Sequence, residues 1–183
     1  IEQNARRKRK VTGVATGFID LDEKLSGLHG SELILIAARP AMGKTAFALN
    51  IAQHAAMKGG VPTAIFSLEM SKEQLATRLI AMDSMVDSQS IRTGQIMDGD
   101  WDKLIDSTHR VGSTPMFIDD TPGITVSELR SKCRKLKQTQ NLGLIVIDYL
   151  QLMNGSGKKE SRQQEISEIS RSLKKLAREL DVP

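Results

Sequence analysis

Cysteine is nearly absent from this sequence of 183 residues. The single cysteine, Cys133, excludes an internal disulfide and a cysteine-rich zinc site. Phenylalanine, tryptophan and tyrosine make up only 3% of the residues, which leaves few side chains that can stack on nucleic-acid bases. The sequence also lacks a run of the roughly 18 apolar residues that a membrane span needs, and its start has no apolar signal-peptide segment. These absences predict a soluble, cytoplasmic protein, and the length of 183 residues with 39% hydrophobic content predicts one compact domain.

A charge excess is also missing once the N-terminal basic run is set aside. The formal net charge is +4, but residues 6–10, RRKRK, supply five positive charges, which leaves −1 for the rest of the chain. The net charge is therefore no evidence that the core binds DNA. Residues 1–12 show no apolar periodicity, and we interpret them as a basic linker from an N-terminal domain that the sequence lacks. Phosphate binding by this run is the alternative.

Strand-like and helix-like segments alternate from about residue 13 onward. Strands are expected at residues 33–38, 62–67, 116–118 and 142–147, and helices from 43, from 71, around 101–111, from 125 and at 162–180. Ser71-Lys-Glu-Gln74 and Thr125-Val-Ser-Glu128 are capping boxes that mark two of the helix starts. The alternation predicts an α/β fold, in which a parallel sheet has helices on both faces.

Residues 38–45, ARPAMGKT, join the first expected strand to a helix. They match the phosphate-loop pattern G-x-x-x-x-G-K-[ST] at its last three positions, with Ala38 in place of the first glycine. In such a loop, backbone N–H groups and Lys44 bind the phosphates of ATP, and the Thr45 hydroxyl binds Mg²⁺. A Gly-Lys-Thr triplet in a surface turn is the alternative, but the strand and the helix around it favour a nucleotide site. The predicted nucleotide-binding residues of this segment are Ala38, Arg39, Pro40, Ala41, Met42, Gly43, Lys44, Thr45 and Ala46.

Two acidic residues follow strands that should end at the same edge of the sheet. Asp148, in LIVIDY, is expected to complete the Mg²⁺ site with Thr45, or alternatively to cap the turn that follows it. Glu69, in FSLEMS, is the candidate base for the attacking water. Its alternative role is to stabilise the start of the next helix, because a carboxylate near a helix N-terminus is favourable.

The amino-acid sequences of these segments resemble those of one family. ARPAMGKTAFALNIA, IFSLEMS, IDDTP, LIVIDYLQLM and RQQEISEISRSLKKLARELDVP look like the signature of the DnaB-type bacterial replicative DNA helicases, in family order and over residues 12–183. Ala38 is also what that family has in place of glycine. Related RecA-like ATPases of recombination and repair share the phosphate loop but not these sequence motifs.

The resemblance implies a RecA-like fold and a hexameric ring with ATP between neighbouring subunits. It also implies translocation on single-stranded DNA during replication, within a primosome, with primase and a helicase loader as partners. By position it assigns Lys44 and Thr45 to phosphates and metal, Glu69 to catalysis as a carboxylate, and Asp148 to the metal through water. Arg78 would lie near the nucleotide base or sugar, although a solvated arginine is the alternative reading.

The extent of the chain departs from the family pattern. Members continue past Val182-Pro183 into a strand with a polar γ-phosphate sensor, and then into DNA-contacting loops and an arginine finger. We therefore expect residues 13–183 to be an ATPase domain that lacks its C-terminal strands. Lys158, Lys159 and Arg162 are candidates for facing DNA, or are simply solvated. A nucleotide-gated binding module without unwinding activity remains the alternative of a different functional class.

Overall fold

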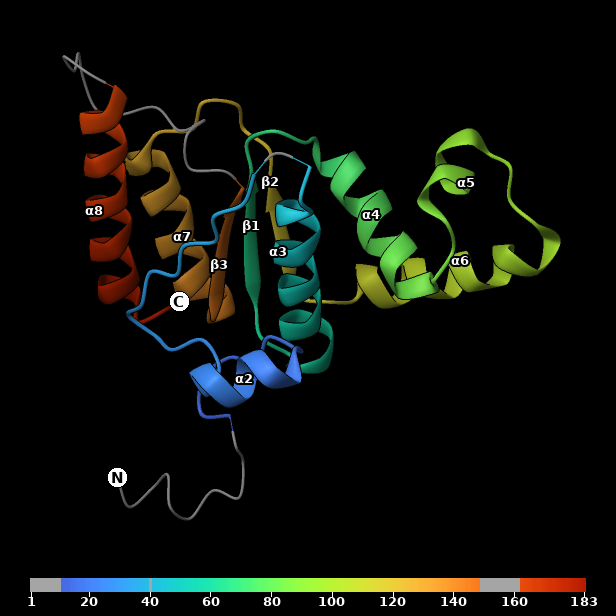
Figure 1. Cartoon of the computed structure of the whole chain (residues 1–183), viewed down its shortest axis with the longest axis horizontal. Coiled ribbons are helices and arrows are strands. Elements are labelled where there is room, and N and C mark those ends of the chain that lie inside the picture. The colour runs from blue at the N-terminus through green and yellow to red at the C-terminus, as the bar shows by residue number, and fades with distance from the viewer. Residues whose placement is uncertain (1–10, 40, 149–161) are drawn as a thin grey trace.

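The computed structural model describes residues 11–39, 41–148 and 162–183. Helices and strands alternate along it (Figure 1). In chain order they are α2 (Ile19–Leu25), α3 (Lys44–Gln53), the π-helix η1 (His54–Lys58), β1 (Thr63–Ser67), α4 (Lys72–Ser84), α5 (Ser88–Thr93), α6 (Asp98–Gly112), β2 (Met116–Asp119), α7 (Val126–Gln140), β3 (Leu144–Asp148) and α8 (Arg162–Leu180). The basic run at 6–10, Pro40, and the loop with Lys158 and Lys159 lie outside the described residues.

The strands β1, β2 and β3 form a parallel sheet in the order β2-β1-β3. They correspond to the predicted strands at 62–67, 116–118 and 142–147, which are confirmed to within two residues at each end. Phe66 of β1 pairs with Asp119 of β2, and Ser67 pairs with Asp148 of β3. Because the strands run in parallel, the segments that follow them meet at one edge of the sheet, where ligands bind in open α/β folds.

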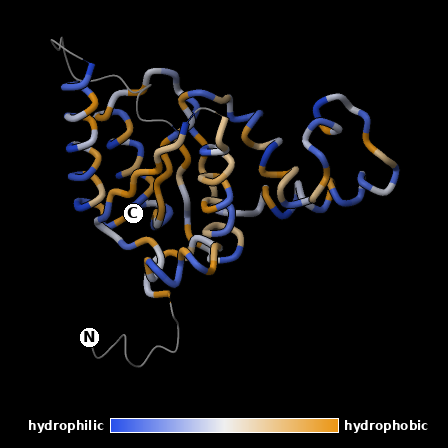
Figure 2. Tube along the Cα trace, in the orientation of Figure 1, coloured by the Kyte–Doolittle hydropathy of each residue, from blue (hydrophilic) through white to orange (hydrophobic). Residues whose placement is uncertain are grey.

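Helices cover both faces of the sheet, as predicted. On one face, Leu129 of α7 and Leu173 of α8 belong to a cluster around Phe66. On the other face, Leu75 of α4 packs with Ile65. Figure 2 shows hydrophobic strands between helices whose outer sides are largely hydrophilic. This layered packing is what fixes the carboxyl edge of the sheet in place.

Both predicted capping boxes are confirmed. Ser71 accepts a hydrogen bond from the Gln74 backbone N–H at 3.3 Å, while the Gln74 side chain accepts one from the Ser71 N–H at 3.1 Å. Thr125 and Glu128 make the same reciprocal pair at the start of α7. The short polar sequence pattern is sufficient to place these two helix starts because both partners of each bond lie within four residues.

The helices α4, α5 and α6 form an arm that extends away from the sheet (Figure 1). The arm is held together by the Arg110–Asp83 ion pair at 2.7 Å and by the Ser107 hydroxyl, which donates to the carbonyl of Ile80 at 3.2 Å. The sequence predicts the helix around 101–111 but gives no indication of α5, which has only 6 residues. A helix this short shows too little apolar periodicity to be recognised.

Cys133 lies fully buried in the cluster between α7 and the sheet. Burial raises the pKa of its thiol to about 12, and the nearby negative charge of Asp119 acts in the same direction. A thiol that stays protonated is a poor nucleophile. The residue therefore contributes packing and no chemistry. Within the described parts of the chain, no helix is both long and apolar enough to cross a membrane.

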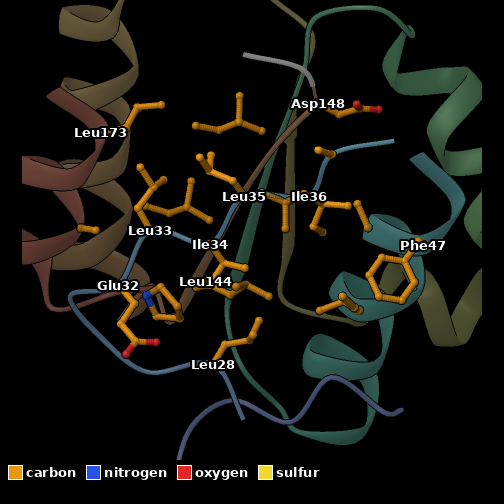
Figure 3. Close-up of a pocket in the computed structure, with 18 of the residues that line it drawn as sticks. Leu28, Glu32, Leu33, Ile34, Leu35, Ile36, Phe47, Leu144, Asp148 and Leu173 are labelled. Atoms are coloured by element: carbon orange, nitrogen blue, oxygen red, sulfur yellow. The ribbon is translucent and has the colours of Figure 1, made fainter. Parts of the chain in front are cut away.

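The prediction of a buried strand at residues 33–38 is wrong. These residues belong to no strand ladder among the described residues, and Leu35 is 68% exposed. They line one side of a groove of about 790 Å³ whose other side includes the whole of β3 (Figure 3). A strand requires a neighbour within hydrogen-bonding reach, and here the groove separates the two backbones. A run of apolar residues indicates β-propensity but does not indicate whether a partner is present.

Candidate nucleotide-binding site

The phosphate-loop segment makes a tight turn into α3. The Met42 N–H donates to the Arg39 carbonyl at 3.3 Å, and Ala41 and Gly43 both have left-handed backbone conformations, with φ of 64° and 84°. Gly43 is the residue that precedes α3, and no side chain among the described residues caps that helix. A Cβ atom at Gly43 would meet no atom within 4 Å. The first N–H groups of α3 are therefore not capped by a side chain of the described residues and are available to an anion.

Lys44, Thr45 and Asp148 lie together at this helix start. One carboxylate oxygen of Asp148, Oδ2, accepts a hydrogen bond from Thr45 Oγ1 at 2.6 Å, and the other, Oδ1, is 3.3 Å from Lys44 Nζ. The Asp148 side chain is only 9% exposed. The parallel register brings them together, because β3 ends at Asp148 on the edge where α3 begins. The turn that Asp148 was alternatively expected to cap lies outside the described residues.

The Thr45 hydroxyl and the Asp148 carboxylate fit a metal that prefers oxygen ligands, such as Mg²⁺. Both offer oxygen ligands, and Mg²⁺ commonly binds one or two carboxylates, with waters and phosphate oxygens completing its shell. Among the described residues, no group of three or more His, Cys, Asp or Glu side chains could hold a metal ion alone. The arrangement therefore suits a metal that arrives with a phosphate ligand rather than a permanently caged one.

Glu69 lies in the bend that follows β1, near this cluster. The N–H of the preceding residue, Leu68, donates to the backbone carbonyl of Asp148 at 2.8 Å. Glu69 is exposed and makes no hydrogen bond or ion pair with other described residues. The structure thus places a free carboxylate at the same sheet edge as Asp148, one residue beyond a backbone contact to it.

The remaining predicted nucleotide-binding residues are exposed where the structure describes them. Ala38, Arg39 and Ala41 are exposed at the start of the loop, and Pro40 lies outside the described residues. Arg78 is exposed on α4, and in the described structure it makes no hydrogen bond or ion pair with the phosphate loop. A nucleotide contact of Arg78 therefore stays a prediction.

Two polar residues around Glu69 were not predicted from the sequence. Ser67, the last residue of β1, is buried, and its hydroxyl makes hydrogen bonds to the backbone of Met70. Asp120, just after β2, accepts a hydrogen bond from the Lys72 N–H at 2.9 Å through Oδ2. The usable signal was their position, because each is a polar residue at the carboxyl end of a parallel strand.

Comparison with known proteins identifies the family to which the chain belongs. Residues 13–183 match the sequence model of the DnaB-like helicase C terminal domain. The chain is 53% identical over 184 residues to the replicative DNA helicase DnaC of Bacillus subtilis and 54% identical over 184 residues to the replicative DNA helicase DnaB of Geobacillus stearothermophilus. All of this chain is covered in both cases, but only 40% of each relative.

Solved structures agree with the sequence comparison. The ATPase domain of G40P superposes with a TM-score of 0.93 and 37% identity, over 99% of this chain and 65% of that one. A DnaB-like replicative helicase, studied with its interactions with primase, gives the same TM-score and identity over 99% of this chain and 45% of that one. The sheet of this chain is therefore the core of a RecA-like ATPase domain, as the sequence predicted.

Proposed function

We infer that this chain, which belongs to the family of DnaB-like helicase C-terminal domains, is the ATP-hydrolysing motor domain of a replicative DNA helicase. The observation that supports this most is the contact of Asp148 with both Lys44 and Thr45 at the uncapped start of α3. Because the chain spans about 40% of the length of the curated relatives it matches, the activity belongs to the full-length protein.

Each residue at the sheet edge has a separate role in ATP hydrolysis. Lys44 and the N–H groups at the start of α3 bind the phosphates, and Lys44 leaves Asp148 Oδ1 to do so. Thr45 and Asp148 hold Mg²⁺, which supplies positive charge that offsets the charge of the phosphates. Glu69 orients the attacking water and accepts its proton. Arg78 contacts the base or the sugar.

Hydrolysis drives movement along single-stranded DNA in a ring of six subunits. A cation from the neighbouring subunit stabilises the transferring phosphoryl group, which makes the subunit interface part of the active site. Few aromatic residues are available for base stacking, so contact with DNA is mainly through phosphates. Primase and a helicase loader are the proposed partners, and the cytoplasm is the proposed location.

Two other functions use the same ATPase core. A RecA-like recombination or repair ATPase is disfavoured by the match of residues 13–183 to the helicase family. A nucleotide-gated module that only assembles partners would bind ATP in the same residues without unwinding DNA. Rates of hydrolysis and unwinding separate this module from a helicase.

The test measures ATP hydrolysis and strand displacement from a forked duplex by the full-length protein. A helicase motor hydrolyses ATP faster when single-stranded DNA is added and displaces the labelled strand only while ATP is consumed. The Glu69→Gln variant should bind ATP with Mg²⁺ but displace no strand, since the lost carboxylate acts on water. Hydrolysis that is unaffected by DNA, together with no displacement, would contradict the proposal and favour the binding module.

A further inference from the structure

The backbone fixes the point from which the Glu69 side chain extends. Among the described residues its side chain has no hydrogen-bond or ion-pair partner, and it lies in the bend between β1 and α4. A carboxylate that must act on a water molecule requires an accurate position, because a displacement of about 1 Å can lower a rate about 10²-fold. The contacts that hold residues 67–72 are therefore relevant to the reaction.

The hydroxyl of Ser67 closes this bend from inside. It donates a hydrogen bond to the Met70 carbonyl at 2.8 Å and accepts one from the Met70 N–H at 3.2 Å. Ser67 is 2% exposed, so water cannot readily replace these bonds. Leu68 and Glu69 are the two residues enclosed by the ring that Ser67 and Met70 form.

The two ends of the bend are fixed by the sheet edge. At its start, the Leu68 N–H donates to the Asp148 carbonyl at 2.8 Å. At its end, the Lys72 N–H donates to Asp120 Oδ2 at 2.9 Å. These bonds fix where the bend begins and where α4 starts. Between those ends, the Ser67 hydroxyl bonds to both backbone groups of Met70, and the Gln74 side chain accepts a hydrogen bond from the Ser71 N–H.

We propose that Ser67 is a positioning residue for ATP hydrolysis, which holds the bend so that the Glu69 carboxylate is directed at the attacking water. The proposal rests on the proposed function, because it requires Glu69 to act on that water. In the described structure the Ser67 hydroxyl makes its hydrogen bonds to Met70 and none to a phosphate-loop side chain. Its loss therefore affects turnover and leaves nucleotide binding intact.

The experiment measures kcat and KM for ATP, and nucleotide affinity, in the full-length protein carrying Ser67→Ala. We expect kcat to fall by about 10- to 100-fold, while KM and affinity change by less than about twofold because Lys44 and Thr45 are untouched. Ser67→Thr keeps the hydroxyl and should recover most of the lost turnover. An unchanged kcat, or a loss of affinity that equals the loss of turnover, would overturn the proposal.

Ser84 provides a matched control. It is also buried, and it lies at the far end of α4. Its hydroxyl donates a hydrogen bond to the Ala81 carbonyl at 3.5 Å and accepts one from the Val86 N–H at 3.3 Å. Ser84→Ala should keep the wild-type kcat. If it loses as much turnover as Ser67→Ala, the effect comes from general loosening of α4 and the proposal is wrong.

Two further variants separate the possible failures. If Glu69→Gln retains full turnover, the proposed role of Glu69 fails and that of Ser67 with it. If Glu69→Gln is inactive but Ser67→Ala is fully active, only the positioning role is refuted. Should Ser67→Ala not fold, Asp120→Ala releases the other end of the bend and should also lower kcat at unchanged KM. Normal kcat in that variant would then count against the proposal.

Discussion

Asp148 contacts Thr45 through one oxygen and Lys44 through the other, and this double contact defines the site at the residue scale. The sequence could predict that these three residues meet, because a phosphate loop and the end of a neighbouring apolar strand have fixed places in a parallel sheet. The position of Ser67 and Asp120 at strand ends was a usable signal, but the sequence could not predict their contacts, which depend on the path of one bend and on the register of β2 beside β1.

The first prediction concerns the metal role of Asp148. In the full-length protein, Asp148→Asn should shift the Mg²⁺ dependence of ATP hydrolysis to higher concentrations, because a neutral amide binds Mg²⁺ more weakly than a carboxylate does. The measurement is a titration of activity with Mg²⁺ at saturating ATP. An unchanged Mg²⁺ midpoint would indicate that Asp148 does not bind the metal and has only a structural role.

Asp119 is the matched control for this titration, since it also ends a strand of the sheet. Burial raises the pKa of its carboxyl, but hydrogen bonds from Lys132 and Thr121 outweigh that effect and hold the pKa below its ordinary value. The Asp119 carboxylate is thus held by Lys132 and Thr121, and in the described structure it makes no hydrogen bond to Thr45 of the phosphate loop. Asp119→Asn should leave the Mg²⁺ midpoint where it is.

At the scale of elements, local signals predicted the helices well, and the apolar runs predicted three strands of four. Each capping box is complete within four residues, so the sequence alone specifies it. The failure at residues 33–38 has a different origin, because pairing of a strand depends on a partner far away in the sequence. Only the structure shows that this segment and β3 lie on either side of a groove.

The second prediction tests the cap of α7. The Thr125 hydroxyl accepts a hydrogen bond from the Glu128 N–H at 3.2 Å, so Thr125→Ala should lower the free energy of unfolding by about 1 kcal/mol. Urea denaturation measures this difference. Thr139→Ala near the other end of α7, where the hydroxyl only bonds to the Lys135 carbonyl of its own helix, should cost less. Equal costs would mean that the cap adds nothing specific.

In the part of the molecule that the structure describes, the groove between residues 33–38 and β3 leaves apolar side chains exposed (Figure 3). Ile34, Leu35 and Ile36 are 40%, 68% and 41% exposed along it. Beside the groove, the Ile145 N–H of β3 donates to the Pro183 carbonyl at 3.0 Å. An apolar groove flanked by two backbones suits an additional strand. We propose that chain following Pro183 in the full-length protein fills it.

The third prediction follows from this groove. A form of the protein extended past Pro183 to the length of its relatives should resist urea better than residues 1–183 alone, because the added strand buries the exposed side chains. It should also hydrolyse ATP faster, since a catalytic arginine from a neighbour is worth about 10³- to 10⁵-fold. Equal stability and equal DNA-stimulated rates, from a monomeric short form, would refute both the filled groove and the interface mechanism.

Lys44→Ala in the full-length protein tests whether the start of α3 is an ATP-hydrolysing centre. The measurement is the steady-state rate of ATP hydrolysis with single-stranded DNA present, beside Lys58→Ala, which removes an exposed lysine at the other end of the same helical segment. We expect a rate reduced by at least about 10²- to 10³-fold for Lys44→Ala, because a charge that stabilises the phosphates is lost, and a normal rate for Lys58→Ala. A wild-type rate in the folded Lys44→Ala variant would contradict this expectation.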